Sequence, residues 1–205
     1  MSVPVPANVR VPDVRGIFSV DDFPAYLQTA GVSRIVYVRI TIRPDSTIQS
    51  CVAEVSSGDT KLDAYTCAII QKRAKFLPAT WTDGSPTYGV IRVPVSWLIA
   101  YAPMSEEDTL RSTVPDLDLS VDRLPKGARK IVGVNVVIAA DENGHAVSCM
   151  ENPTPGSNSK RHFPELVSIA CQQVAAKWTA VPPIDTTGKA ARSIQTVSVH
   201  MKLDR

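Results

Sequence analysis

The feature that most constrains the fold of this chain is an internal repeat. The stretch "SVDDFP" at residues 19–24 recurs as "SVDRLP" at residues 120–125. Each copy precedes a short polar stretch and then a strand-like apolar run, "RIVYVRITI" from Arg34 and "KIVGVNVVI" from Lys130. Ordered self-similarity of this kind indicates repeated structural units. The repeat therefore predicts two halves built on one plan.

Each half is expected to follow the order β-β-α-β. In the first half, the run from Arg34 meets a polar turn, and a second strand reaches Cys51. A helix with apolar residues at helical spacing follows near Lys61 and ends before Pro78. The stretch "YGVIRVPVSW" at residues 88–97 then alternates like a strand. The second half repeats this order, with its helix in "FPELVSIACQQVAAKW" and its last strand in "SIQTVSVHMKL".

This pattern predicts an α+β fold with two tandem domains. The first is expected at residues 19–101 and the second at residues 120–205, each a small antiparallel sheet packed on one main helix. Residues 1–18 would form an N-terminal extension. The acidic, proline-containing stretch at residues 102–119 is expected to be a linker.

The four cysteines fall into two sequence-local pairs, Cys51 with Cys67 and Cys149 with Cys171. Such pairs suit disulfides in an oxidising compartment, with buried free thiols as the alternative. A zinc site needs closer ligand spacing, such as C-x₂-C, which neither pair has. We expect each pair to fasten a strand to the following helix. A disulfide closing such a loop contributes roughly 3 kcal/mol, a large share of a small domain's stability.

Charge and hydropathy exclude two classes of partner. The 22 basic and 20 acidic side chains give a net charge of +2, so no basic field for nucleic acid is expected. The longest apolar run, at residues 131–140, is far shorter than the roughly 20 residues that span a bilayer. The first residues lack the pattern of a signal peptide. The chain is then either a cytosolic protein or the mature form of an exported one, and the cysteine pairs favour export.

Several pieces of the first half carry a family resemblance. "DDFPAYLQTAGVSRIVYVRITI", "SSGDTKLDAYTC", "RAKFLPA", "DGSP" and "VPVSW" occur in this order within about residues 20–97. Together they resemble the TonB C-terminal domain family, in the cysteine-bearing form common among periplasmic proteins of alphaproteobacteria. Residues 121–203 resemble the same domain more weakly. They depart from it at "ENPTPGSNSKRHFPEL", where the family has "SSG…LD".

The resemblance implies a non-enzymatic periplasmic module, with its signal peptide absent from this chain. Such a module accepts a protein or peptide segment as an added β-strand, for example a segment of an outer-membrane receptor in TonB-dependent transport. We expect the last strand of the first half to supply this edge, although Pro94 cannot donate a hydrogen bond there. The candidate edge residues are Val90, Ile91, Arg92, Val93, Val95 and Trp97.

The alternative is a structural role. The two halves, or two copies of the chain in a homodimer, would pair their edges with each other and leave none free for a ligand. An enzyme is not expected, because no arrangement of titratable groups in the sequence matches a catalytic pattern. No metal site and no cofactor are predicted either.

Overall fold

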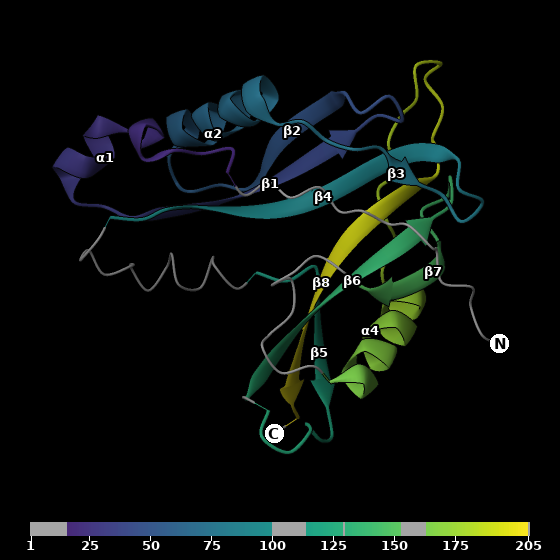
Figure 1. Ribbon diagram of the computed structural model, residues 1–205. Helices are drawn as coiled ribbons and strands as arrows, with labels where there is room; N and C mark the ends of the chain where they lie inside the picture. The colour runs from purple at the N-terminus through teal and green to yellow at the C-terminus, as the bar shows by residue number, and fades with distance from the viewer. Residues whose placement is uncertain (1–15, 100–113, 129, 153–162, 205) are drawn as a thin grey trace.

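The computed structural model describes residues 16–99, 114–128, 130–152 and 163–204. They form an α+β fold in which eight strands make one mixed sheet and the helices lie on its faces (Figure 1). The strand order is β2-β1-β4-β8-β6-β7, with β3 paired to β4 and β5 paired to β8. The strands are β1 (Arg34–Ile42), β2 (Ile48–Val55), β3 (Ala79–Thr80), β4 (Pro86–Trp97), β5 (Leu117–Val121), β6 (Ile131–Ala140), β7 (Ala146–Glu151) and β8 (Ser193–Leu203). The helices are the 3₁₀-helix η1 (Val20–Asp22) and the α-helices α1 (Ala25–Ala30), α2 (Thr60–Arg73) and α4 (Pro164–Lys177).

In the first half, α2 covers an antiparallel sheet of β2, β1 and β4. The helix begins after Asp59, whose side chain accepts the N–H groups of Lys61 and Leu62 at 2.9 and 3.3 Å. These contacts satisfy donors that the first helical turn leaves free. Successive strand residues point to opposite faces. Val36 and Ile40 of β1 therefore turn toward the helix and are buried in one cluster with Leu62.

The second half is built in the same way. Strand β6 pairs antiparallel with β7 and with β8, and α4 packs on β6 and β7. Val136 and Ile138 of β6 are buried in a second cluster with Leu166 and Val174 of α4. The order of elements in both halves is the one that the repeat predicts, with the short strands β3 and β5 added.

A parallel pairing between β4 and β8 joins the two halves into one sheet. The sequence suggested a small sheet for each half, but the edge of β8 away from β6 is paired with β5 only from Val199 onward, which leaves its first residues open to β4. Unpaired edges are a liability in water, and here they partly cover each other. The pairs are Tyr88 with Ser193, Gly89 with Ile194, and Val90 with Gln195.

The helices α2 and α4 lie on opposite faces of this sheet (Figure 1). Paired residues share a face of the sheet, so Ile194 lies on the same face as its partner Gly89. Ile91 of the α2 cluster is two residues after Gly89 and therefore lies on this face too. Val197, an odd number of positions from Ile194, faces the other side and packs in the α4 cluster. Each half therefore buries a different face of the shared sheet.

Contacts beyond the strand pairing also join the halves. A third small cluster contains Ala79 of β3, Val137 and Ala139 of β6, and Ile194 of β8. On β2, Gln49 Nε2 donates to the backbone oxygen of Ile184, in the loop before β8, at 2.7 Å. The junction is thus supported by contacts outside the β4–β8 ladder as well.

The predicted boundaries fall partly on residues outside those described. Residues 1–15 of the expected extension and residues 102–113 of the expected linker lie outside them. The last linker positions, residues 117–119, belong to β5, which pairs with β8 in parallel. None of the helices in the described parts of the chain is long and apolar enough to cross a membrane.

Candidate functional site

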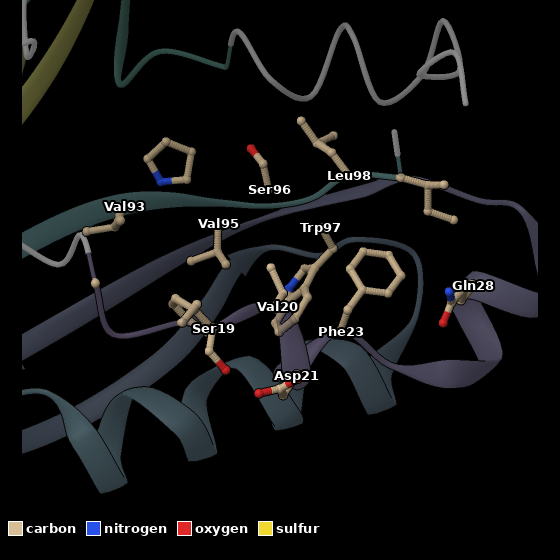
Figure 2. A pocket seen from close by; sticks show the side chains of 14 residues that line it. Ser19, Val20, Asp21, Phe23, Gln28, Val93, Val95, Ser96, Trp97 and Leu98 are labelled. Carbon is tan, nitrogen blue, oxygen red and sulfur yellow. The ribbon is translucent and has the colours of Figure 1, made fainter. Parts of the chain in front are cut away.

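A groove of about 840 Å³ runs beside the C-terminal part of β4 (Figure 2). One wall is β4 and the residues that follow it, from Val93 to Ile99. The other wall is the segment before α1, from Gly16 to Phe23, with Gln28 of α1 at one end. Asp21 is the one charged side chain among the lining residues.

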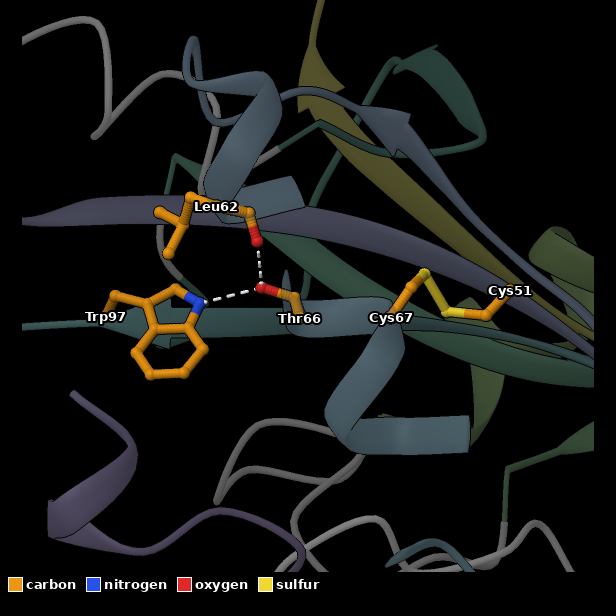
Figure 3. The surroundings of a disulfide bond; sticks show 5 residues. All are labelled: Cys51, Leu62, Thr66, Cys67 and Trp97. Carbon is orange, nitrogen blue, oxygen red and sulfur yellow. Dashed lines mark hydrogen bonds between the residues drawn. A yellow bond between two sulfur atoms is a disulfide. The ribbon is translucent and has the colours of Figure 1, made fainter. Parts of the chain in front are cut away.

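Trp97 anchors the groove in the core. Its ring is 4% exposed and meets the rings of Phe18 and Phe23 edge-on, with centroids 5.4 and 6.1 Å apart. The indole Nε1 donates to Thr66 Oγ1 at 3.0 Å, and that hydroxyl donates to the backbone oxygen of Leu62 at 2.7 Å (Figure 3). Because the buried indole N–H is satisfied, the ring is held in one orientation.

An ion pair fixes the other wall. Arg73 at the end of α2 donates to both oxygens of Asp22, at 2.6 and 2.7 Å, and also to the backbone oxygen of Ile17 at 3.2 Å. The Ser19 N–H donates to Asp22 as well, at 2.7 Å. The Arg73 hydrogen bonds, with the Ser19 N–H, hold the pKa of Asp22 well below its usual range. The segment carrying Phe18 is therefore tied to α2.

Alternate residues of β4 direct their backbone N–H and C=O groups away from β1. The Arg92 N–H donates to Thr196 Oγ1 of β8 at 3.2 Å, so Arg92 directs its backbone groups away from β1. By strand alternation, Pro94 and Ser96 point the same way. Pro94 has no N–H, which leaves Ser96 as the next donor on this edge. Beyond Val90, none of the described strands pairs with the edge of β4 that faces away from β1.

A charged cluster lies where β4 and β8 separate. The Asp116 carboxylate is 7% exposed, and the guanidinium groups of Arg39 and Arg92 are each 3.8 Å from it. It also accepts the Ser198 N–H at 2.8 Å. Burial raises the pKa of Asp116, although the two arginines oppose this. Arg92 also lies 2.8 Å from Glu54.

The predicted edge residues divide between several environments. Val90 pairs with Gln195 of β8, and Arg92 joins the charged cluster. The side chains of the others turn toward α2, and of these Val93 is only partly buried. The edge residues facing α2 are Ile91, Val93, Val95 and Trp97.

The four cysteines lie apart from the groove, in two disulfides. Cys51 is bonded to Cys67 and Cys149 to Cys171, which are the pairs expected from the sequence. In the described residues, no group of three or more His, Cys, Asp or Glu side chains is placed to hold a metal ion.

Sequence reasoning missed the second wall of the groove. "SVDDFP" at residues 19–24 served as the marker of the repeat and as part of the family resemblance, yet Phe18 just before it and its Phe23 contact Trp97. The available signal was two aromatic residues spaced around an acidic turn, close to a predicted edge strand. Thr66, a buried hydroxyl in the middle of α2, gave no pattern that would distinguish it from a solvent-facing residue.

Comparison with known proteins identifies this part of the chain. Residues 21–99 match the model of the Gram-negative bacterial TonB protein C-terminal family. These residues form a TonB C-terminal domain. The family model detects no second copy, so it does not extend to the resemblance noted for residues 121–203. No curated protein and no solved structure matches the chain.

Membership of this domain in the family implies a TonB-like module with protein partners, and the family is non-enzymatic. The TonB C-terminal domain and the two disulfides are both consistent with the periplasm, where disulfides persist. The groove borders β4, the last strand of the TonB C-terminal domain, on the side away from β1.

Proposed function

We propose that this chain is a non-enzymatic periplasmic module that binds an extended segment of another protein as a strand added to β4. The observation that carries the proposal is the coincidence of an open strand edge with a groove. Beyond Val90 the edge has no partner among the described strands, and the groove borders the same edge from Val93 onward.

Backbone chemistry supports this mode of binding. Ser96 presents its N–H and C=O away from β1, and Pro94 presents its C=O there, so a ligand strand can form hydrogen bonds with both. Side chains of the ligand that point toward the α2 face would meet Val95 and the aromatic cluster around Trp97. Main-chain pairing would supply affinity, and these contacts would supply selectivity.

The second half is proposed to be a divergent relative of the same domain. It repeats the order of elements, packs its helix α4 on its sheet and carries a disulfide in the equivalent place, from Cys149 on β7 to Cys171 on α4. On this proposal the chain consists of two tandem TonB C-terminal-like domains. A receptor segment from the outer membrane is the ligand class that the family suggests.

A structural role is the second candidate, favoured by the β4–β8 ladder. This ladder covers the edge at Tyr88, Gly89 and Val90. If the covered part of the edge were the functional one, the chain would be a self-contained pair with no ligand.

The test uses two substitutions at one exposed position. Ser96→Pro removes the outward N–H but leaves the pairing with β1 intact, because Ser96 does not donate toward β1. Ser96→Ala keeps the N–H and is the matched control. Peptides from receptor energy-coupling segments are titrated into each ¹⁵N-labelled protein. We expect roughly tenfold weaker binding for the Pro variant only. Equal binding by both variants, or no binding by the wild type, would overturn the proposal.

A further inference from the structure

The edge of β4 is already occupied along part of its length by the chain's own second half. Strand β8 pairs with β4 as far as Val90 and Gln195. The next outward N–H, that of Arg92, donates to Thr196 Oγ1 at 3.2 Å. The Arg92 side chain donates to the backbone oxygen of Val114 at 2.7 Å. Among the described residues, the first outward groups of β4 that have no partner are therefore those of Pro94.

The pairing of β8 with β4 is stabilised by contacts at both ends of the ladder. Thr87 Oγ1 donates to the backbone oxygen of Arg192 at 3.0 Å, and the Arg192 guanidinium donates to Ser85 Oγ at 2.8 Å. Arg192 also stacks over the ring of Trp81, with its guanidinium carbon 4.9 Å from the centroid. Beyond the end of the ladder, where β4 and β8 separate, Asp116 accepts the Ser198 N–H and lies near the guanidinium groups of Arg39 and Arg92. A ligand would have to break several such contacts to displace β8.

The open part of the edge is short. From Val93 to Trp97 a strand advances about 3.3 Å per residue, which accommodates a ligand strand of about five residues. Ser96 supplies an N–H and a C=O, and Pro94 supplies only a C=O. So few hydrogen bonds give modest affinity, and alternate apolar side chains on the ligand would have to pack against the wall formed by Val95, Trp97 and Phe18.

We propose that the second half acts as a stop that limits the ligand to a short extended segment with alternating apolar side chains, paired with Val93–Trp97 and excluded from β4 at and before Arg92. This inference rests on the proposed strand addition at β4. The occupant is inferred from continuity, because the open edge is the direct extension of an edge that already pairs with a strand in this protein. Thr196 and Asp116 act as positioning residues for the stop.

Amide hydrogen exchange in the full chain tests this inference. In the free protein, the Arg92 amide should exchange slowly and the Ser96 amide quickly. Thr196→Val removes the acceptor and should accelerate exchange at Arg92, whereas Thr196→Ser retains the hydroxyl and should not. An unchanged Arg92 rate in the Val variant would overturn the role of Thr196 in the stop.

Binding of a series of extended receptor-derived peptides, from about four to twelve residues long, then measures the longest ligand strand that β4 can pair with. We expect Ser96 to become protected, Arg92 and Ile194 to keep their rates, and affinity to level off beyond about six residues. Affinity that keeps rising with length, or faster exchange at the Ile194 amide on binding, would overturn the stop while leaving strand addition intact. No protection of Ser96 by any peptide would overturn the proposed function itself.

Discussion

Cys51, on a strand at one end of the sheet, is bonded to Cys67 on the helix that covers that strand, with their Cα atoms 5.6 Å apart. Cys149 and Cys171 have the same relationship at the other end, between β7 and α4. An outermost strand has a hydrogen-bonded neighbour on one side only, so it is the first part of a sheet to open. Both disulfides therefore fasten the strands that need it most.

Replacing either disulfide should destabilise the protein. The cysteines of the first pair are 16 residues apart and those of the second 22. The chain-entropy argument gives about 3 kcal/mol for loops of this length. We expect Cys51→Ala/Cys67→Ala to lower the unfolding free energy by that amount and to speed amide exchange in β2 first. Cys149→Ala/Cys171→Ala, the matched pair, should affect β7 instead. An unchanged melting temperature under reducing conditions would contradict this.

The hydrogen bond between Trp97 and Thr66 should be needed for the groove. Thr66→Val keeps the shape of the side chain but leaves a buried indole N–H without its acceptor. Such a group costs about 1–3 kcal/mol. We expect the free energy of unfolding, measured by chemical denaturation, to fall by this amount, and the NMR signal of the Trp97 indole N–H to shift. Thr66→Ser, which keeps the hydroxyl, is the control and should lose much less. Equal stabilities for the two variants would refute the assignment.

Much of this architecture follows from local sequence patterns, for physical reasons. The order of elements in each half and the helix ends depend on neighbours within a few residues, such as Asp59 and the N–H groups that it caps. The cysteine pairs could also be predicted, because each is close in sequence. The pairing of Val90 with Gln195 could not, because it joins residues more than a hundred positions apart and leaves no local trace. For the same reason, the sequence could not show that Val90, at the start of the predicted edge, is covered by β8.

The groove wall carried by Phe18 should depend on pH through Asp22. The folded-state pKa of Asp22 is lowered, chiefly by the hydrogen bonds from Arg73. Its stabilisation is then present above the ordinary pKa of 3.8 and is lost as the pH falls from there toward the folded-state value. Asp22→Asn should therefore be less stable than the wild type at pH 7, and the difference should vanish in strong acid.

The neighbouring Asp21→Asn is the control for this experiment. Asp21 is exposed and has no ion pair among the described residues, so its replacement should change stability little at either pH. Urea unfolding at several pH values measures both variants. A difference between the wild type and the Asp22 variant that does not change with pH would show that Asp22 acts through packing and not through its charge.

Arg92 should be the residue on which the junction of the halves most depends. Its side chain is buried, lies within 3.8 Å of Asp116 and 2.8 Å of Glu54, and covers the ring of Tyr37 at 4.5 Å. Arg92→Met leaves the buried Asp116 carboxylate with Arg39 as its remaining cationic partner. Removing one partner of a buried ion pair costs about 3–5 kcal/mol, and we expect a loss toward the lower figure because Arg39 remains.

The pH dependence of this loss distinguishes charge from packing. Asp116 has a raised folded-state pKa, so its ionised form costs stability, and this cost is relieved as the pH falls through that pKa toward the ordinary value of 3.8. Without Arg92 the cost should be larger, so the variant should recover part of its deficit in mild acid, measured by urea unfolding. Arg123→Met, at an exposed arginine, is the matched control and should stay within about 0.5 kcal/mol of the wild type. A deficit for Arg92→Met that is the same at pH 7 and pH 4.5 would mean that the lost contacts with Tyr37, and not the charge of Asp116, account for it.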